Sequence, residues 1–134
     1  MRIRVRATED AIIRLLRDGH PLPGDLVKRE EETRLPVFQN VEAQPVKNFG
    51  IPSSARIVVA RGRKDVWFVD IKRRGGKVTL TEGKQFLQLR DQLQTQYKGQ
   101  KVTGWLVTTS EVETKVHDHI NANECFATAR AARR

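Results

Sequence analysis

The chain has almost no cysteine, few histidines and few aromatic residues. Cys125 is its single cysteine, so no disulfide can form within the chain and a cysteine-based zinc site is excluded. The three histidines, His20, His117 and His119, are too few and too poorly placed for a zinc cluster. Aromatic residues make up 6% of the chain, which argues against a single-strand-binding module that stacks bases on exposed rings.

Long apolar segments are also missing. No run approaches the length of a membrane span, so we expect no membrane partner. The N-terminus reads MRIRVR and lacks the apolar segment of a signal peptide. We therefore expect a cytoplasmic protein, either of a cell or of a virus acting in the host cytoplasm.

Positive charge is what the chain has in excess. Its 134 residues carry 25 Lys and Arg against 16 Asp and Glu, which gives a formal net charge of +9. A domain this basic favours an anionic partner, and nucleic acid is the commonest one. A basic surface with no specific ligand is the alternative. The length predicts a single domain over residues 1–134, with a basic arm or edge strand at about 1–7 and a flexible basic tail at about 127–134.

Capping residues and hydrophobic periodicity predict the helices and strands. The expected helices run from a Thr8 cap to Gly19, from Asp25 to about Arg34, from a cap at Thr79 or Thr81 to about Tyr97, and onward from a cap at Ser110. The expected strands cover residues 37–46, 57–60, 66–72 and 102–108, with the second and third joined as a β-hairpin. This order predicts a mixed α/β fold, with one central sheet flanked by helices.

The strand at 66–72 ends in Asp70-Ile71-Lys72. Side chains alternate across a strand, so Asp70 and Lys72 are expected on the same face. A carboxylate can hold a hard divalent cation, and a nearby lysine can stabilise a developing negative charge. The pair therefore suits metal-assisted cleavage of a phosphodiester. A solvated strand edge is the alternative interpretation.

Further elements surround this triplet in a characteristic order. They are Gly50-Ile51-Pro52, the aliphatic strand 57–60, the basic glycine-containing turn 73–77, a helix that carries Gln85, and the strand around Trp105. Over about residues 40–120 the pattern resembles the PD-(D/E)XK nuclease superfamily, most closely the virus-type replication-repair (VRR-type) nuclease and Holliday junction resolvase-like domains. The resemblance implies a restriction-endonuclease-like core, a Mg²⁺- or Mn²⁺-dependent DNA endonuclease for branched or structured DNA, and a homodimer.

The resemblance also implies roles for individual residues. Asp70 and the Ile71 carbonyl would hold the metal ion, and Lys72 would support the attacking water or the transition-state charge. Gln85 would orient the site or contact a phosphate, and Glu9 could be the carboxylate of the first helix. Alternative carboxylate donors are Glu30, Glu31 and Glu32, which otherwise form a solvated charge run.

One departure from the family concerns its first aspartate. Ser53 follows Pro52, and Arg56 stands at the other expected position, so neither supplies a carboxylate. We expect Arg56 to pair with Asp70 instead. Two other carboxylates could take over the lost role: Asp65, which strand alternation places on the opposite face from Asp70, and Glu42 on the neighbouring strand.

Basic residues flank the triplet in the sequence, and we expect them to bind phosphates without reading bases. They are Arg61, Arg63, Lys64, Arg73, Arg74 and Lys77. Besides the nuclease, two other functions remain open. One is a catalytically inactive nuclease fold that binds DNA or a partner, which Arg56 favours. The other is a structural basic domain, such as a ribonucleoprotein component.

Overall fold

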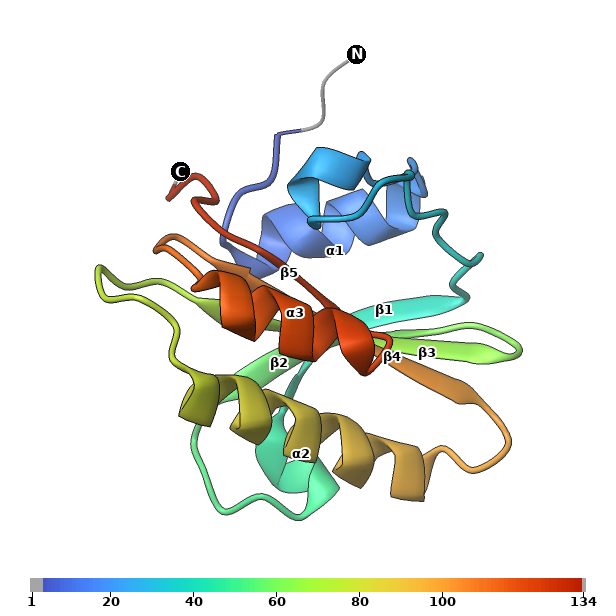
Figure 1. Cartoon of the computed structure of the whole chain (residues 1–134). Helices are drawn as coiled ribbons and strands as arrows, with labels where there is room; N and C mark the ends of the chain where they lie inside the picture. Colours follow the sequence, from blue (N-terminus) through green and yellow to red (C-terminus); the bar gives the residue numbers. More distant parts are fainter. Residues whose placement is uncertain (1–3, 134) are drawn as a thin grey trace.

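A mixed sheet with helices on both faces forms the protein (Figure 1). The computed structural model describes residues 4–133; Met1–Ile3 and Arg134, which belong to the expected arm and tail, lie outside the described residues. The elements follow in the order α1 (Glu9–Asp18), 3₁₀ helix η1 (Gly24–Leu26), β1 (Asn40–Pro45), 3₁₀ helix η2 (Val46–Phe49), β2 (Arg56–Arg61), β3 (Asp65–Lys72), α2 (Leu80–Gln96), β4 (Lys101–Thr108), α3 (Thr114–Ala122) and β5 (Phe126–Thr128).

The strands lie side by side in chain order, β1-β2-β3-β4-β5. The first three form an antiparallel meander, which confirms the predicted hairpin between β2 and β3. β4 runs parallel to β3, and β5 runs parallel to β4. Because parallel neighbours need a crossover, α2 connects β3 to β4 and α3 connects β4 to β5. The predicted mixed α/β fold with a central sheet and flanking helices is therefore correct.

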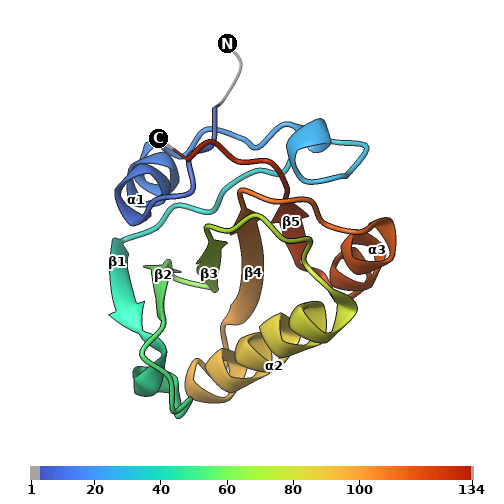
Figure 2. The ribbon, with the colours of Figure 1, turned by 90° about the vertical axis from the view of Figure 1, so that its left-hand side faces the viewer.

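Alternation along β3 assigns its side chains to two hydrophobic cores. Phe68 packs beneath α2 and α3, whereas Trp67 and Val69 pack on the face that α1 covers. Figure 2 shows α1 on one side of the sheet and α2 and α3 on the other. We call these the α1 face and the α2 face. Any polar side chain on β3 must belong to one of them.

The predicted ends of two helices are confirmed. The Thr8 hydroxyl accepts a hydrogen bond from the Ala11 amide, and Gly19 ends α1 at a φ of 73°, the left-handed conformation that glycine adopts without strain. Thr79, not Thr81, caps α2, and it forms a capping box with Glu82. The Thr79 cap fixes where α2 begins, and this sets the position of the first polar side chains of α2.

Two helix predictions are wrong. The segment from Asp25 to Arg34 forms only the 3₁₀ helix η1, because its chain turns back and Thr33 exchanges backbone hydrogen bonds with Leu22. A run of charged residues without an apolar stripe offers the helix no face to bury. α3 begins after Glu113 rather than Ser110, whose hydroxyl instead bonds to that of Thr108.

The C-terminal segment differs from the expected flexible tail. Ala127 belongs to β5 and is fully buried, and Ala131 is also buried. Arg6 pairs with Ala132 in a parallel bridge, which joins the two ends of the described chain. Sequence alone does not reveal this pairing, since the tail is short and rich in alanine and arginine.

Within residues 4–133 we find no helix with the length and apolar character that a membrane crossing requires.

Candidate active site

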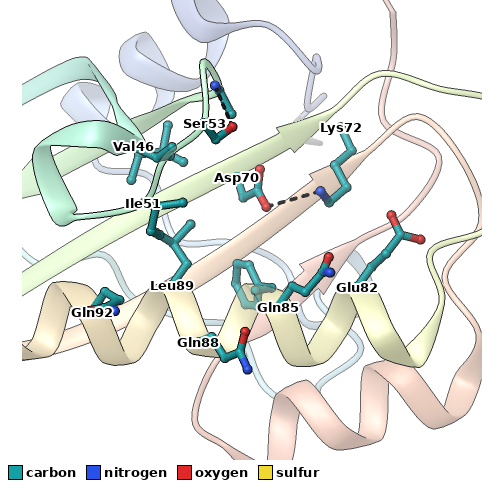
Figure 3. A pocket seen from close by; sticks show the side chains of 13 residues that line it. Val46, Ile51, Ser53, Asp70, Lys72, Glu82, Gln85, Gln88, Leu89 and Gln92 are labelled. Carbon is teal, nitrogen blue, oxygen red and sulfur yellow. Dashed lines mark hydrogen bonds and ion pairs between the residues drawn. The ribbon is translucent and has the colours of Figure 1, made fainter.

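A pocket opens on the α2 face where β3 ends. Asp70 and Lys72 line it from the sheet, Gln85 lines it from α2, and the segment from η2 to the start of β2 forms the opposite wall (Figure 3). Its volume is about 380 Å³. Asp70 and Lys72 share this face with Phe68, as strand alternation requires. The structure therefore brings together the three residues predicted to be catalytic.

Asp70 and Lys72 form an ion pair inside the pocket. Lys72 Nζ lies 3.6 Å from Asp70 Oδ2, and the two side chains are only 28% and 19% exposed. Burial raises the pKa of the Asp70 carboxyl above its ordinary value, Lys72 lowers it, and the nearby Glu82 carboxylate raises it further. The net shift is upward, so one lysine does not fully compensate this carboxylate for the loss of water.

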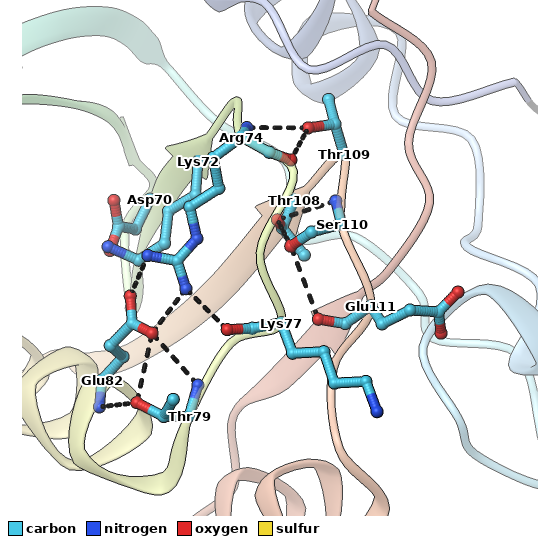
Figure 4. Close-up of polar contacts among 10 residues, drawn as sticks. All are labelled: Asp70, Lys72, Arg74, Lys77, Thr79, Glu82, Thr108, Thr109, Ser110 and Glu111. Carbon is cyan, nitrogen blue, oxygen red and sulfur yellow. Dashed lines mark hydrogen bonds and ion pairs between the residues drawn. The ribbon is translucent and has the colours of Figure 1, made fainter.

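Glu82 is a second carboxylate in the same pocket, and the sequence interpretation missed it. It lies in the first turn of α2, where it accepts a hydrogen bond from the Thr79 amide at 3.1 Å. Arg74, from the turn after β3, forms an ion pair with it (Figure 4). Hydrogen bonds from Arg74 lower the pKa of Glu82 to about 2 against the opposing effect of burial, with further lowering by the Thr79 hydrogen bonds. Glu82 is therefore ionised at neutral pH.

The expected pairing of Arg56 with Asp70 is wrong. Arg56 Nε lies 3.1 Å from Glu9 Oε2, in a different cavity on the α1 face that Ile71 also lines. The strand register explains the difference, because Val59 lies opposite Phe68 and the odd-numbered residues of β2 therefore share a face with the even-numbered residues of β3. Arg56 and Asp70, both even-numbered, point to opposite faces.

The lining of the pocket identifies the positions that do face Asp70. Ser53, Ala55 and Ile57 line the pocket opposite the Asp70–Lys72 pair. None of them carries a carboxylate, so the position that corresponds to the first aspartate of the nuclease superfamily in the resemblance stays without an acid. Glu9 cannot fill it, since it lies on the α1 face.

The other proposed carboxylate donors also lie outside the pocket. Asp65 lines a different cavity together with Trp67, on the face that strand alternation predicted. Glu42 lies opposite Val59 and so shares the α2 face, but it is exposed and accepts a hydrogen bond from Gln44. The run Glu30, Glu31 and Glu32 lines a cavity beside Asp118.

The basic residues divide into two groups. Arg73, Arg74 and Lys77 follow β3 directly and lie at the Asp70 end of the strand. Arg61, Arg63 and Lys64 lie at the hairpin between β2 and β3. At a rise of about 3.3 Å per residue, Lys64 is roughly 20 Å from Asp70 along β3. The hairpin group therefore does not surround the pocket, although it is close in sequence.

The donors of the pocket fit one kind of metal site. In the described chain, residues 4–133, no three or more His, Cys, Asp or Glu side chains are grouped to hold a metal ion. Asp70, Glu82 and Gln85 nevertheless give the pocket two carboxylates and one amide, all with oxygen donors. Mg²⁺ commonly binds one or two carboxylates and completes its shell with waters and substrate phosphates. Arg74 and Thr79 already bond to the Glu82 carboxylate, so the set would fit an ion shared with a bound phosphate and does not fit an ion enclosed by protein.

Comparisons of the chain with protein-family models, with curated proteins and with solved structures gave no match.

Proposed function

We propose that this protein is a Mg²⁺- or Mn²⁺-dependent endonuclease that hydrolyses phosphodiester bonds in branched or structured DNA. The observation that carries the proposal is the pocket at the end of β3, where Asp70, Lys72, Glu82 and Gln85 come together. The order of helices and strands from α1 to α3 agrees with the order that the nuclease resemblance implies. The net charge of +9 supports an anionic substrate.

The carboxylates of Asp70 and Glu82 would hold the cation, with the Ile71 carbonyl as the further ligand that the resemblance implies. When bound, the cation neutralises charge on the phosphate and lowers the pKa of a bound water. The raised pKa of Asp70 supports this role, since a buried carboxylate that its neighbours do not fully compensate favours a nearby positive charge.

Lys72 and Gln85 would act on the phosphate itself. The Lys72 ammonium donates hydrogen bonds and stabilises the negative charge that develops on the phosphate oxygens. The Gln85 side chain points toward the Asp70–Lys72 pair (Figure 3), and its amide can orient the attacking water or donate to a phosphate oxygen. Lys77, exposed in the turn before α2, would bind a neighbouring phosphate without reading sequence. Arg73 lines the cavity on the α1 face and donates a hydrogen bond to the Arg133 carbonyl, so it does not belong to this pocket.

A second candidate function is DNA or partner binding without cleavage. Two observations favour it: no carboxylate stands at Ser53, Ala55 or Ile57, and Arg74 already pairs with Glu82. In both proposals the protein acts in the cytoplasm of a cell or an infected cell, and the resemblance implies a homodimer.

The test is cleavage of labelled four-way, flap and linear DNA in Mg²⁺ or Mn²⁺. The wild type is compared with Lys72→Ala, with an EDTA control and with Lys98→Ala, which removes an exposed lysine beyond the far end of α2. We expect cutting of branched DNA that disappears in EDTA and in Lys72→Ala and persists in Lys98→Ala. Salt-sensitive DNA binding without cutting in either metal would reject the nuclease and support the second candidate.

A further inference from the structure

The pocket extends from Asp70 along α2, beyond the residues that we propose to act on the phosphate. Val46, Ile51 and Leu89 line this part of the pocket, and they are aliphatic side chains from η2, the following loop and α2 (Figure 3). Val46 and Leu89 belong to the buried core, while Ile51 is partly exposed. Metal-assisted hydrolysis requires polar groups and water, so these apolar walls call for a different explanation.

Amide side chains follow the same groove along α2. Gln85, Gln88 and Gln92 all line the pocket and are exposed. Their spacing of three and four residues places them on one helix face, and the helix rise of 1.5 Å per residue separates Gln85 from Gln92 by about 10 Å. Elsewhere on α2, Gln94 binds backbone carbonyls, including that of Gln100 at 2.7 Å. The amides of Gln88 and Gln92 have no such partner among residues 4–133 and are available to a ligand.

A nucleobase matches this combination of surfaces. It has two flat faces that pack against apolar side chains and an edge of donors and acceptors that amides can bind. The cavity volume of about 380 Å³ lies within the range of small-molecule sites. A base within a duplex has its faces stacked and its edge paired, so only an unpaired base can enter.

We propose that the half of the pocket formed by Val46, Ile51, Leu89, Gln88 and Gln92 binds one unpaired nucleobase, next to the phosphate at Asp70 and Lys72. The phosphate position rests on the proposed function. The site then selects DNA with an unpaired nucleotide beside the target bond, as at a bulge, flap or branch. Selection comes from the base itself and not only from the shape of the backbone.

The experiment measures binding rather than cleavage, by fluorescence anisotropy in EDTA. Three labelled hairpin DNAs share one stem: the first carries a single bulged nucleotide, the second an abasic residue at the same place, and the third is fully paired. We expect the bulged DNA to bind about tenfold more tightly than the abasic DNA, the order expected when a base packs against protein. The fully paired DNA should resemble the abasic one.

Matched variants assign the preference to the groove. Gln88→Ala combined with Gln92→Ala should reduce the base preference to about twofold or less, while Gln96→Ala should keep it. Gln96 is exposed on α2 but lies outside the pocket, and all these side chains are exposed, so folding is not at risk.

The outcomes separate this proposal from the nuclease proposal. Equal affinity for bulged and abasic DNA, a preference that survives in the double variant, or no DNA binding would each overturn the nucleobase site. A base preference that depends on Gln88 and Gln92 supports it even when no metal-dependent cleavage is found. In that case the nuclease proposal fails and the protein is a reader of unpaired bases.

Discussion

The Asp70–Lys72 pair and the Glu9–Arg56 pair lie on opposite faces of the sheet, at the end where β2 begins and β3 ends. The side chains of Glu9 and Arg56 are 40% and 54% exposed, whereas those of Asp70 and Lys72 are 19% and 28% exposed. Solvent screens an exposed pair, so it contributes little to stability or chemistry. Burial raises the pKa of Asp70. The Asp70–Lys72 pair also lines a pocket that contains a second carboxylate, that of Glu82. Both pairs join a carboxylate to a basic side chain, but they differ in their exposure to solvent. This difference in environment makes the Asp70–Lys72 pair the better candidate for chemistry.

The largest difference between the faces should appear in cleavage rate. We expect Lys72→Ala to lower the single-turnover rate about 10²–10³-fold, the usual effect of removing one donor that stabilises transition-state charge. Arg56→Ala removes a cation on the α1 face and should change the rate less than about twofold. Equal losses in the two variants, with both folded by circular dichroism, would contradict the assignment of the site to the α2 face.

Glu82 forms the capping box of α2 and, in our proposal, also binds the cation; matched variants can separate these two roles. Glu82→Gln removes a carboxylate from the pocket but keeps an oxygen that can accept the Thr79 amide hydrogen bond of the capping box, whereas Thr79→Ala removes the N-cap hydroxyl of α2. Thr79→Ala should therefore cost about 1 kcal/mol of unfolding free energy in urea titrations. Only Glu82→Gln should raise the Mg²⁺ concentration needed for half-maximal cleavage. We expect a rise of at least about tenfold, because mutating even a residue that only hydrogen-bonds to a metal ligand commonly lowers metal affinity by this factor. A similar rise in Thr79→Ala would mean that Glu82 acts only through the helix.

Lowering the pH should destabilise the wild-type protein, because Glu82 becomes protonated. Its pKa is lowered from 4.5 to about 2 in the folded protein, chiefly by hydrogen bonds from Arg74. A lowered folded-state pKa gives stability that is present above the unfolded value and is lost as pH falls toward the folded value. The unfolding free energy should therefore decrease between about pH 4.5 and pH 2, and this decrease should be smaller in Glu82→Gln. Identical acid profiles would show that Arg74 does not stabilise ionised Glu82.

The smallest expected effect is a gain of stability at the site. Because burial raises the pKa of Asp70, ionising this carboxyl is less favourable in the folded protein than in the unfolded chain, and its charge therefore costs stability at pH 7. Asp70→Asn should raise the unfolding free energy by up to about 1 kcal/mol, within the range of most single substitutions. Glu9→Gln on the exposed α1 face should leave it nearly unchanged. Destabilisation by Asp70→Asn would mean that the ion pair with Lys72 outweighs the cost of burial.

Strand alternation predicted that Asp70 and Lys72 share a face, because alternation acts within a few neighbours; the position of Gln85 beside them was implied by the nuclease resemblance, and the structure brings the three together. The expected Arg56–Asp70 pair was wrong, since the face of Arg56 depends on the register between two strands, which single-strand alternation does not fix. Glu82 was missed although Thr79-x-x-Glu82 is a recognisable capping box, because its place in the pocket depends on how α2 packs over β3. The catalytic roles of all these residues remain predictions.

Mn²⁺ binding tests most directly whether the α2 face holds the cation. Free Mn²⁺ is followed by electron paramagnetic resonance during titration of the wild type, Asp70→Asn and Glu9→Gln, with and without a phosphorothioate DNA that resists hydrolysis. The account predicts binding that DNA strengthens, that Asp70→Asn abolishes and that Glu9→Gln leaves intact. Absence of Mn²⁺ binding, or binding that depends on Glu9 and not on Asp70, would contradict it.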